Sequence, residues 1–205
     1  LVGALENEGV DRIFGVPGEE NLDVVESLRT SSIKLILTRH EQGAAFMAAT
    51  YGRLTGKPGV CITTLGPGAL NLVTAAGLAT VNRLPVLLLP GDTYATRRQG
   101  PVLQQLQHPV EADGTVNDAF RPISRFFDRI NRPEQLLTAL PHAMRVLTDP
   151  VDTGAVVLSL PQDVQSHAFD FPAEFFAERD WVIRRPIADP DEIQAVARLL
   201  ARAQK

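Results

Sequence analysis

The sequence contains a single cysteine, Cys61, and a single tryptophan, and aromatic residues make up only 6% of its 205 positions. One cysteine excludes an internal disulfide. Cys61 lies inside the apolar run 59–63. We therefore expect a buried structural thiol rather than a nucleophile at this position.

An excess of positive charge is also missing, because 24 acidic residues outnumber 20 Lys and Arg and give a formal net charge of -4. Nucleic-acid binding usually requires a basic stripe, and binding to a membrane surface requires a polybasic run, so neither partner is expected. No apolar stretch is long enough to span a bilayer, and no signal peptide is recognisable. A soluble cytoplasmic protein is the resulting expectation.

The chain has ordinary globular proportions, with 44% hydrophobic and 21% charged residues, and its short apolar runs alternate with helical patterns. This alternation is typical of βαβ units. We therefore predict an α/β fold, a doubly wound parallel sheet of about six strands with helices on both faces. The expected strands are 12–16, 33–37, 59–63, 86–90, 124–128 and 155–160, and the expected helices are 20–29, 42–55, 69–81 and 133–147.

Three segments differ in composition. Residues 1–165 carry the alternating pattern, and their first residues resemble the second half of a helix, so we expect a truncated domain. The polar stretch 91–122 within it has no period and is expected to be functional or mobile. Residues 166–188 are aromatic and aperiodic, as in an extended arm or linker. Asp189 is a suitable N-cap for a helix in 189–205, the start of a further domain that is missing here.

Glu41 is the most informative single residue. It lies between the expected strand 33–37 and the expected helix 42–55, which places it at the carboxyl edge of the sheet. Ligands bind at that edge in open α/β sheets. An acidic residue in a first helical turn can also simply complement the helix dipole, so Glu41 alone does not separate the two interpretations.

Four ordered segments, 14–18, 39–45, 56–61 and 66–71, resemble the pyrimidine-binding N-terminal domain of thiamine-diphosphate enzymes of the acetolactate synthase type. The resemblance extends to about residue 164. It assigns residues 1–165 to that domain and residues 189–205 to the first helix of the family's middle domain.

The resemblance implies a catalytic and cofactor-binding role for Glu41. In this family a glutamate in this motif hydrogen-bonds the N1′ nitrogen of the cofactor's aminopyrimidine ring. Sharing a proton there favours the imino tautomer, which deprotonates the thiazolium carbon. The small residues 43–45 would leave room for the flat ring.

The resemblance also places Pro17, Gly18 and Asn71 beside the cofactor, together with the turn Gly66-Pro67-Gly68. Taken alone, Pro17-Gly18 is a strand-to-helix turn and Asn71 a turn former. A glycine-rich turn at a helix start can hold phosphate, but this spacing matches neither common phosphate motif.

Three further residues are candidates for contact with a small-molecule substrate. Either Gln104 or Gln105 occupies the position of a family glutamine that faces the reacting centre, and we favour Gln105 over Gln104. A solvated helix face explains both glutamines as well. His40 either contacts substrate or makes a structural hydrogen bond. The histidines have no metal-ligand spacing, and we expect no metal ligand in this chain.

The family holds the diphosphate and Mg²⁺ through a Gly-Asp-Gly motif in a separate domain, and this sequence lacks that motif; Gly91-Asp92-Thr93 is only a superficial match. The resemblance therefore implies a homo-oligomer in which the diphosphate-binding domain of a second subunit completes the site. The isolated chain is expected to be inactive. Whether FAD binds is left open.

Segments 101–106, 116–125 and 128–135 resemble one branch of the family, the trihydroxycyclohexane-1,2-dione hydrolases of myo-inositol catabolism. That likeness implies hydrolytic opening of the substrate ring at a C–C bond. Two alternatives stay open: acetolactate synthase or a related 2-oxo-acid carboligase or decarboxylase, and a non-catalytic interaction module that keeps the fold.

Overall fold

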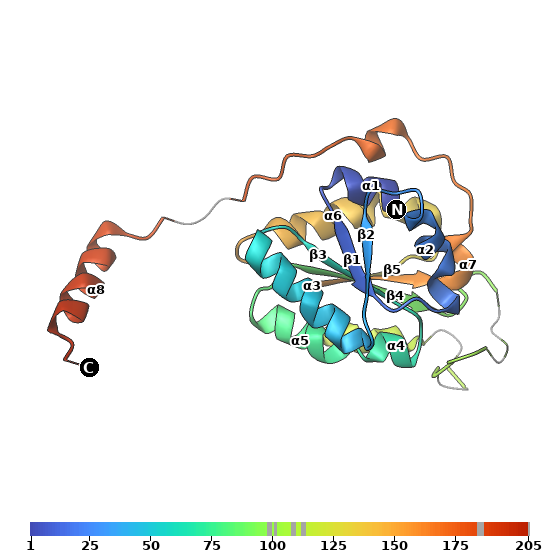
Figure 1. Cartoon of the computed structure of the whole chain (residues 1–205), viewed down its shortest axis with the longest axis horizontal. Helices are drawn as coiled ribbons and strands as arrows, with labels where there is room; N and C mark the ends of the chain where they lie inside the picture. The colour runs from blue at the N-terminus through green and yellow to red at the C-terminus, as the bar shows by residue number, and fades with distance from the viewer. Residues whose placement is uncertain (98–99, 101, 108–109, 112–113, 184–186, 205) are drawn as a thin grey trace.

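The fold is an open sheet of six parallel strands with helices on both faces (Figure 1). The computed structural model describes residues 1–97, 100, 102–107, 110–111, 114–183 and 187–204. The strand order is β2-β1-β3-β4-β6-β5, and all five neighbouring pairs are parallel. The doubly wound α/β fold predicted from the alternating pattern is confirmed.

The strands are β1 (Arg12–Gly15), β2 (Lys34–Leu37), β3 (Gly59–Thr63), β4 (Val86–Asp92), β5 (Phe126–Arg129) and β6 (Ala155–Pro161). One face carries α1 (Val2–Asn7), α2 (Leu22–Leu28) and α6 (Leu136–Thr148), and the other carries α3 (Glu41–Thr55), α4 (Pro67–Leu70) and α5 (Val73–Val81). The remaining elements are α7 (Gln162–Gln165), α8 (Pro190–Arg202) and the 3-10 turns η1 (Glu19–Asn21), η2 (Val116–Ile123), η3 (Pro133–Gln135) and η4 (Ala173–Phe176). No helix in the described part of the chain is long and apolar enough to cross a membrane.

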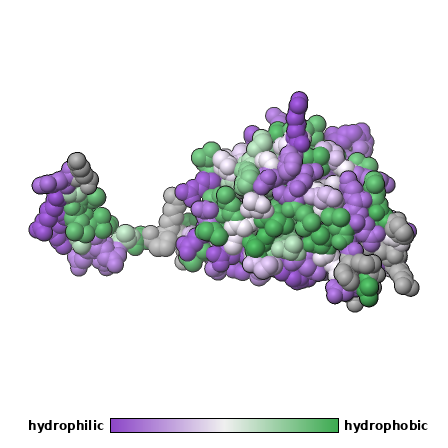
Figure 2. Space-filling view, turned by 90° about the horizontal axis from the view of Figure 1, so that it is seen from below, coloured by the Kyte–Doolittle hydropathy of each residue, from purple (hydrophilic) through white to green (hydrophobic). Residues whose placement is uncertain are grey.

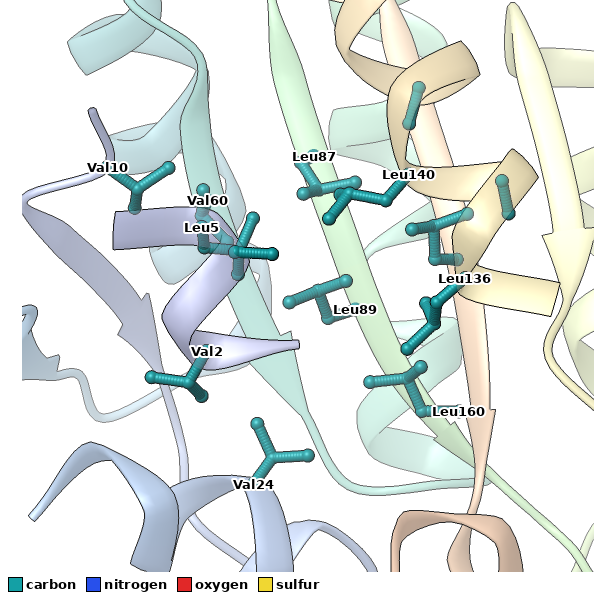
Figure 3. Packing of buried hydrophobic residues seen from close by; sticks show 14 of the residues in the cluster. Val2, Leu5, Val10, Val24, Val60, Leu87, Leu89, Leu136, Leu140 and Leu160 are labelled. Atoms are coloured by element: carbon teal, nitrogen blue, oxygen red, sulfur yellow. The ribbon is translucent and has the colours of Figure 1, made fainter. Parts of the chain in front are cut away.

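The central strands are covered on both faces, so alternate side chains enter different cores. In β3, Val60 and Ile62 belong to the cluster under α1, α2 and α6, whereas Cys61 belongs to the cluster under α3 and α5. Figure 3 shows the first cluster, where Leu87 and Leu89 of β4 meet Leu136 and Leu140 of α6. The sequence predicts one apolar stripe on the helix 133–147, made of Leu136, Leu137, Leu140, Met144 and Leu147, and all five pack in this cluster.

Helix α3 approaches the sheet through its smallest residues. Ala44, Ala45, Ala48 and Ala49 are each at most 1% exposed. A Cβ atom placed on Gly59 of β3 would lie 1.8 Å from the carbonyl oxygen of Ala48. The two backbones are therefore in direct contact, and this contact fixes the position of the whole helix.

Two expected elements differ in detail from the observed ones. The apolar composition of 33–37 predicts a buried strand, but β2 is an edge strand and Leu37 is 67% exposed. The apolar composition of β2 could not reveal that no further strand pairs with it. The weak strand expected at 124–128 is β5, which begins two residues later at Phe126.

The helix expected over 69–81 is two helices, α4 and α5, separated at Asn71 and Leu72. Asn71 ends α4, and its side chain is hydrogen-bonded outside the helix instead of continuing a helical face. The alanine-rich composition on both sides gives no sign of this break. Helix 133–147 likewise starts with the 3-10 turn η3 before α6 begins.

The strand order reverses between β1 and β3. The chain passes from β1 outward to its neighbour β2 and then crosses back to pair β3 with the other side of β1. Ligands of open parallel sheets bind outside the carboxyl ends of the strands at such a reversal. The turns that follow β1, β2 and β3 therefore converge on one edge.

Beyond α7 the chain crosses α1 as an extended arm and ends in a separate helix (Figure 1). The arm is held to α1 by Glu8, which accepts hydrogen bonds from Arg179 and from the indole of Trp181. Asp189 caps α8 by accepting the backbone N–H of Asp191 at 2.8 Å. The residues 184–186 and several positions between 93 and 115 lie outside the described residues, so the mobility expected for the polar stretch stays a prediction.

The close contact of α3 with the sheet predicts opposite effects for two Gly→Ala substitutions in that helix. A Cβ on Gly52 would lie 2.3 Å from the carbonyl oxygen of Pro85, whereas a Cβ on Gly43 would meet nothing within 4 Å. Gly52→Ala should lower the free energy of unfolding by about 1–3 kcal/mol through overpacking. Gly43→Ala should raise it by roughly 0.4–1 kcal/mol by reducing the entropy of the unfolded chain.

Urea denaturation of this chain, followed by circular dichroism, measures both effects. Gly43→Ala is the matched control, because it makes the same change in the same helix at an open position. Equal stabilisation by both substitutions would show that α3 does not contact the sheet backbone.

Candidate active site

The edge at the strand-order reversal is built from three turns, one after each of β1, β2 and β3. Glu41 follows β2 and is the first residue of α3, so its carboxyl group lies at the carboxyl edge, as expected from the sequence. It is half-buried. Its position in the first helical turn also complements the helix dipole, so both interpretations of this residue are compatible with its location.

Asn71 connects the turn after β3 to Glu41. Its side-chain amide donates a hydrogen bond to Oε2 of Glu41 at 2.8 Å. The other carboxyl oxygen, Oε1, faces Gly68, where an added Cβ would be 3.5 Å away. One oxygen of Glu41 is therefore held by Asn71, and the other borders a position without a side chain.

The small residues after Glu41 differ in their surroundings. Ala44 and Ala45 are fully buried against the sheet, where they belong to the packing of α3, and Gly43 is exposed. A Cβ atom on Gly43 would meet nothing within 4 Å, so the room expected beside Glu41 stays a prediction. Gly68, in the neighbouring turn, is the residue without a side chain beside Oε1 of Glu41.

Thr64 is the centre on which the turns meet. A Cβ on Gly18 would lie 2.8 Å from Cβ of Thr64, and a Cβ on Gly68 would lie 2.7 Å from its Cγ2. Any side chain at either glycine would therefore collide with Thr64. The turn after β1 and the turn after β3 can both contact Thr64 because each has a glycine at the point of contact.

Glu20 and Thr64 are site residues that the sequence reasoning missed. Glu20 lies in η1 and is only 3% exposed, and its carboxyl group accepts a hydrogen bond from the hydroxyl of Thr64. The same hydroxyl lies 3.1 Å from Oε1 of Gln104. The position of Glu20 two residues after Gly18 is the only sequence feature that could have indicated it.

The two glutamines are distinguished by their contacts. Gln104 has the positive φ of 61° and places its carbonyl oxygen 1.9 Å from a Cβ built on Gly66, whose own φ is 60°. Its side chain reaches Thr64, whereas Oε1 of Gln105 accepts a hydrogen bond from the backbone N–H of Val102 at 3.1 Å. Gln104 therefore contacts Thr64, and which of the two glutamines faces the reacting centre stays a prediction.

His40 and Pro17 stand at the margin of the group. His40 is the N-cap of α3, and its Nδ1 accepts the backbone N–H of Gln42 at 3.2 Å. This is the structural hydrogen bond that the sequence left open as an alternative to substrate contact. Pro17 is exposed in the turn after β1, where it precedes the capped 3-10 turn η1.

A second buried network lies at the ends of β4 and β6. Asp92 is fully buried and accepts hydrogen bonds from Arg129 at 2.7 Å, Thr115 at 2.6 Å and Ser159 at 2.8 Å. Both ends of the segment 93–115 are thus attached to Asp92, since Thr93 donates its backbone N–H to the same carboxylate. The role of Asp92 is structural, and its likeness to a diphosphate motif is superficial.

Among the residues that the structure describes, no group of three or more His, Cys, Asp or Glu side chains could hold a metal ion. Cys61 is fully buried in β3, as expected for a structural thiol. Burial, and then the negative charge of Glu41, raise the pKa of the Cys61 thiol far above its usual range.

Residues 1–113 match the family described as "Thiamine pyrophosphate enzyme, N-terminal TPP binding domain". Because the match covers more than half of the 205 residues, the chain belongs to this family of thiamine-diphosphate-binding domains. The family resemblance drawn from the four ordered segments is therefore confirmed.

The chain is also similar to individual curated proteins. The chain is 44% identical over 200 residues to 3D-(3,5/4)-trihydroxycyclohexane-1,2-dione hydrolase of Clostridium perfringens. It is 42% identical to the protein of that name from Geobacillus thermodenitrificans and 41% identical to that from Bacillus cereus. These alignments cover 97% of this chain and 31% of each relative, so the chain spans about a third of the length of these curated relatives.

The buried thiol predicts that Cys61 is inert in the native protein. A thiol reacts as its thiolate, and both burial and Glu41 oppose that form. Ellman's reagent should detect no thiol in the folded chain at pH 8 and one thiol per chain in guanidinium chloride. Fast native-state reaction would contradict the packing of β3 against α3.

Proposed function

We propose that this chain is the cofactor-binding N-terminal part of a thiamine-diphosphate-dependent hydrolase that opens the ring of 3D-(3,5/4)-trihydroxycyclohexane-1,2-dione. The observation that carries the proposal is the Glu41 carboxyl group at the carboxyl edge, with one oxygen held by Asn71 and the other beside Gly68. The identity of 41–44% to hydrolases of that name supports the choice of substrate.

The residues at this edge fit the aminopyrimidine end of thiamine diphosphate. Gly68 places no side chain of its own beside Oε1 of Glu41, and a ring nitrogen that hydrogen-bonds this oxygen needs an approach without such a side chain. When bound, the cofactor supplies the carbanion chemistry that cleaves a C–C bond beside a carbonyl group. The described residues provide no metal cluster, so we assign Mg²⁺ and the diphosphate to another domain.

Glu41 would hold the proton that is shared with the ring nitrogen. Asn71 donates to Oε2, so Oε1 is the oxygen left for that proton. Covering of the edge by a second domain would remove water and strengthen the shared hydrogen bond.

The substrate would lie against the group formed by Thr64 and Gln104. Gln104 is exposed and presents an amide, which can both donate to a carbonyl and accept from a hydroxyl group. A ring with three hydroxyl groups and two carbonyl groups offers both partners. Hydrolysis between the two carbonyl carbons consumes one water, leaving a carboxylic acid at one carbon and an aldehyde at the other.

We also propose that the covering domain comes from a second subunit of a cytoplasmic homo-oligomer. Large apolar side chains gather on the face formed by α3 and α5, where Met47, Leu54, Leu78 and Val81 are 42–82% exposed. Figure 2 shows hydrophobic side chains gathered on the face that carries α4 and α5 in Figure 1. This face begins beside Glu41, so a partner seated on it would also cover the site.

The proposal predicts that Glu41→Gln inactivates the full-length protein containing this chain. The amide cannot share a proton as a carboxyl group does, and loss of one acid–base partner costs about 10²–10⁴-fold in rate. The measurement is turnover of the trihydroxycyclohexanedione, with pyruvate as the comparison substrate.

His40→Gln is the control, because it changes the adjacent residue but leaves the carboxylate in place. Near-normal turnover by the Glu41→Gln protein would exclude the assigned role. Turnover of pyruvate instead of the dione would favour an acetolactate synthase or a related carboligase.

A second prediction concerns the isolated chain. We assign the diphosphate and Mg²⁺ to another domain, so isothermal titration with thiamine diphosphate and Mg²⁺ should give very weak binding or none. The full-length protein should bind under the same conditions. Tight, Mg²⁺-dependent binding by this chain alone would mean that the diphosphate site has been assigned to the wrong domain.

A further inference from the structure

A buried carboxyl group that the proposed reaction does not use lies next to the site. Glu20 is 3% exposed, and among the described residues no ion pair includes it. Its carboxyl group instead accepts the hydroxyl of Thr64. Burial of a carboxyl group costs free energy that an apolar residue would not, so packing alone gives no reason for glutamate here.

Glu20 does not serve as the cap of its own turn. The backbone N–H of Gly18 donates to Oδ1 of Asn21 at 3.0 Å, so Asn21 closes η1. The backbone of Glu20 is held separately, because its carbonyl oxygen accepts the side-chain amide of Gln165 at 2.8 Å. The carboxyl group is therefore presented to Thr64 from a fixed backbone.

The hydroxyl group of Thr64 that contacts Glu20 also contacts Gln104. Its Oγ1 lies 3.1 Å from Oε1 of Gln104, on the segment that Gly66 admits to the edge. Its methyl carbon Cγ2 faces Gly68, the same glycine that borders Glu41. The hydroxyl group of Thr64 thus contacts Glu20 and Gln104, and its methyl group faces Gly68 in the turn that we propose to bind the cofactor.

The hydroxyl of Thr64 has one hydrogen, and two acceptors lie within reach of it. If Glu20 is ionised it takes that hydrogen, and the amide of Gln104 must turn its NH₂ group toward Oγ1. If Glu20 is protonated it donates to Oγ1, and Thr64 donates to Oε1 of Gln104. The carboxyl group therefore sets which end of the amide is left facing outward.

We propose that Glu20 is a positioning residue that acts through Thr64 to fix the orientation of the Gln104 amide toward the substrate. This inference rests on the proposed function for the identity of the substrate. It assigns Glu20 no contact with the cofactor or the reacting atoms. Its effect should appear in substrate binding and turnover, while the Glu41–Asn71 pair and cofactor affinity stay unchanged.

The first test needs no substrate. In this chain, labelled with ¹⁵N, the side-chain amide of Gln104 is assigned by comparison with Gln104→Ala. Its two proton resonances should be displaced from free-glutamine values and should return toward them in Thr64→Val, which removes the hydroxyl but keeps the shape. Thr64→Ser keeps the hydroxyl and should retain the displaced resonances.

Glu20→Gln should change these resonances, whereas Glu19→Gln, its exposed neighbour in η1, should not. Melting curves from circular dichroism identify any variant that fails to fold, and Thr64→Val then carries the test alone. The inference would be overturned if the side-chain amide resonances of Gln104 were the same in wild type, Thr64→Val and Glu20→Gln.

The second test measures kinetics in the full-length protein. Glu20→Gln and Thr64→Val should each lower kcat/KM for the dione by roughly tenfold, the effect of one lost hydrogen bond, with unchanged affinity for thiamine diphosphate. Combined with Gln104→Ala, neither should add a further loss, because all three act through one amide. Additive losses, or unchanged kcat/KM in both single variants, would exclude the positioning role and leave Glu20 with a structural role only.

The two tests fail in different ways. Absence of dione turnover by the wild-type protein would refute the proposed function, and the NMR comparison would still decide whether Glu20 controls Gln104. Normal turnover with no coupling among Glu20, Thr64 and Gln104 would refute the inference and leave the proposed function standing.

Discussion

The backbone contact between α3 and β3 is the constraint on which the site depends. A side chain on Gly59 would occupy the space of the Ala48 carbonyl group, so only glycine allows the helix to lie this close to the sheet. Four buried alanines continue the contact along α3. Because the helix is fixed along its length, its first residue, Glu41, is fixed as well, at the end of an edge strand that buries little of its own surface.

The rest of the edge also depends on glycines, because the absence of a side chain lets two backbones approach closely. Gly18 and Gly68 let two turns close on Thr64, and Gly66 admits the backbone of Gln104. Polar groups then fill the space between the turns: Glu41 with Asn71, and Glu20 with Thr64 and Gln104. The result is an edge with two carboxyl groups, one bonded to Asn71 and one to the hydroxyl of Thr64.

Several features were accessible from residues alone because they depend on local pattern. The six parallel strands, the apolar stripe of α6 and the buried Cys61 follow from periodicity and composition, and the family follows from ordered motifs. The break between α4 and α5 was not accessible, because Asn71 leaves its helix for a partner 30 positions away. The contact of Gln104 with Thr64 was not accessible either, since adjacent glutamines differ only in what the fold places beside them.

The sequence by itself determined the class of fold, the family, and Glu41 at a strand-to-helix boundary, because each depends on residues close together in the chain. The tertiary structure decided which small residues serve packing and which leave space: Ala44 and Ala45 face the sheet, and Gly68 borders the carboxyl group. It also brought Glu20 to Thr64 across 44 positions and attached both ends of the segment 93–115 to Asp92. These pairings depend on the order of strands in the sheet, and no short-range pattern records that order.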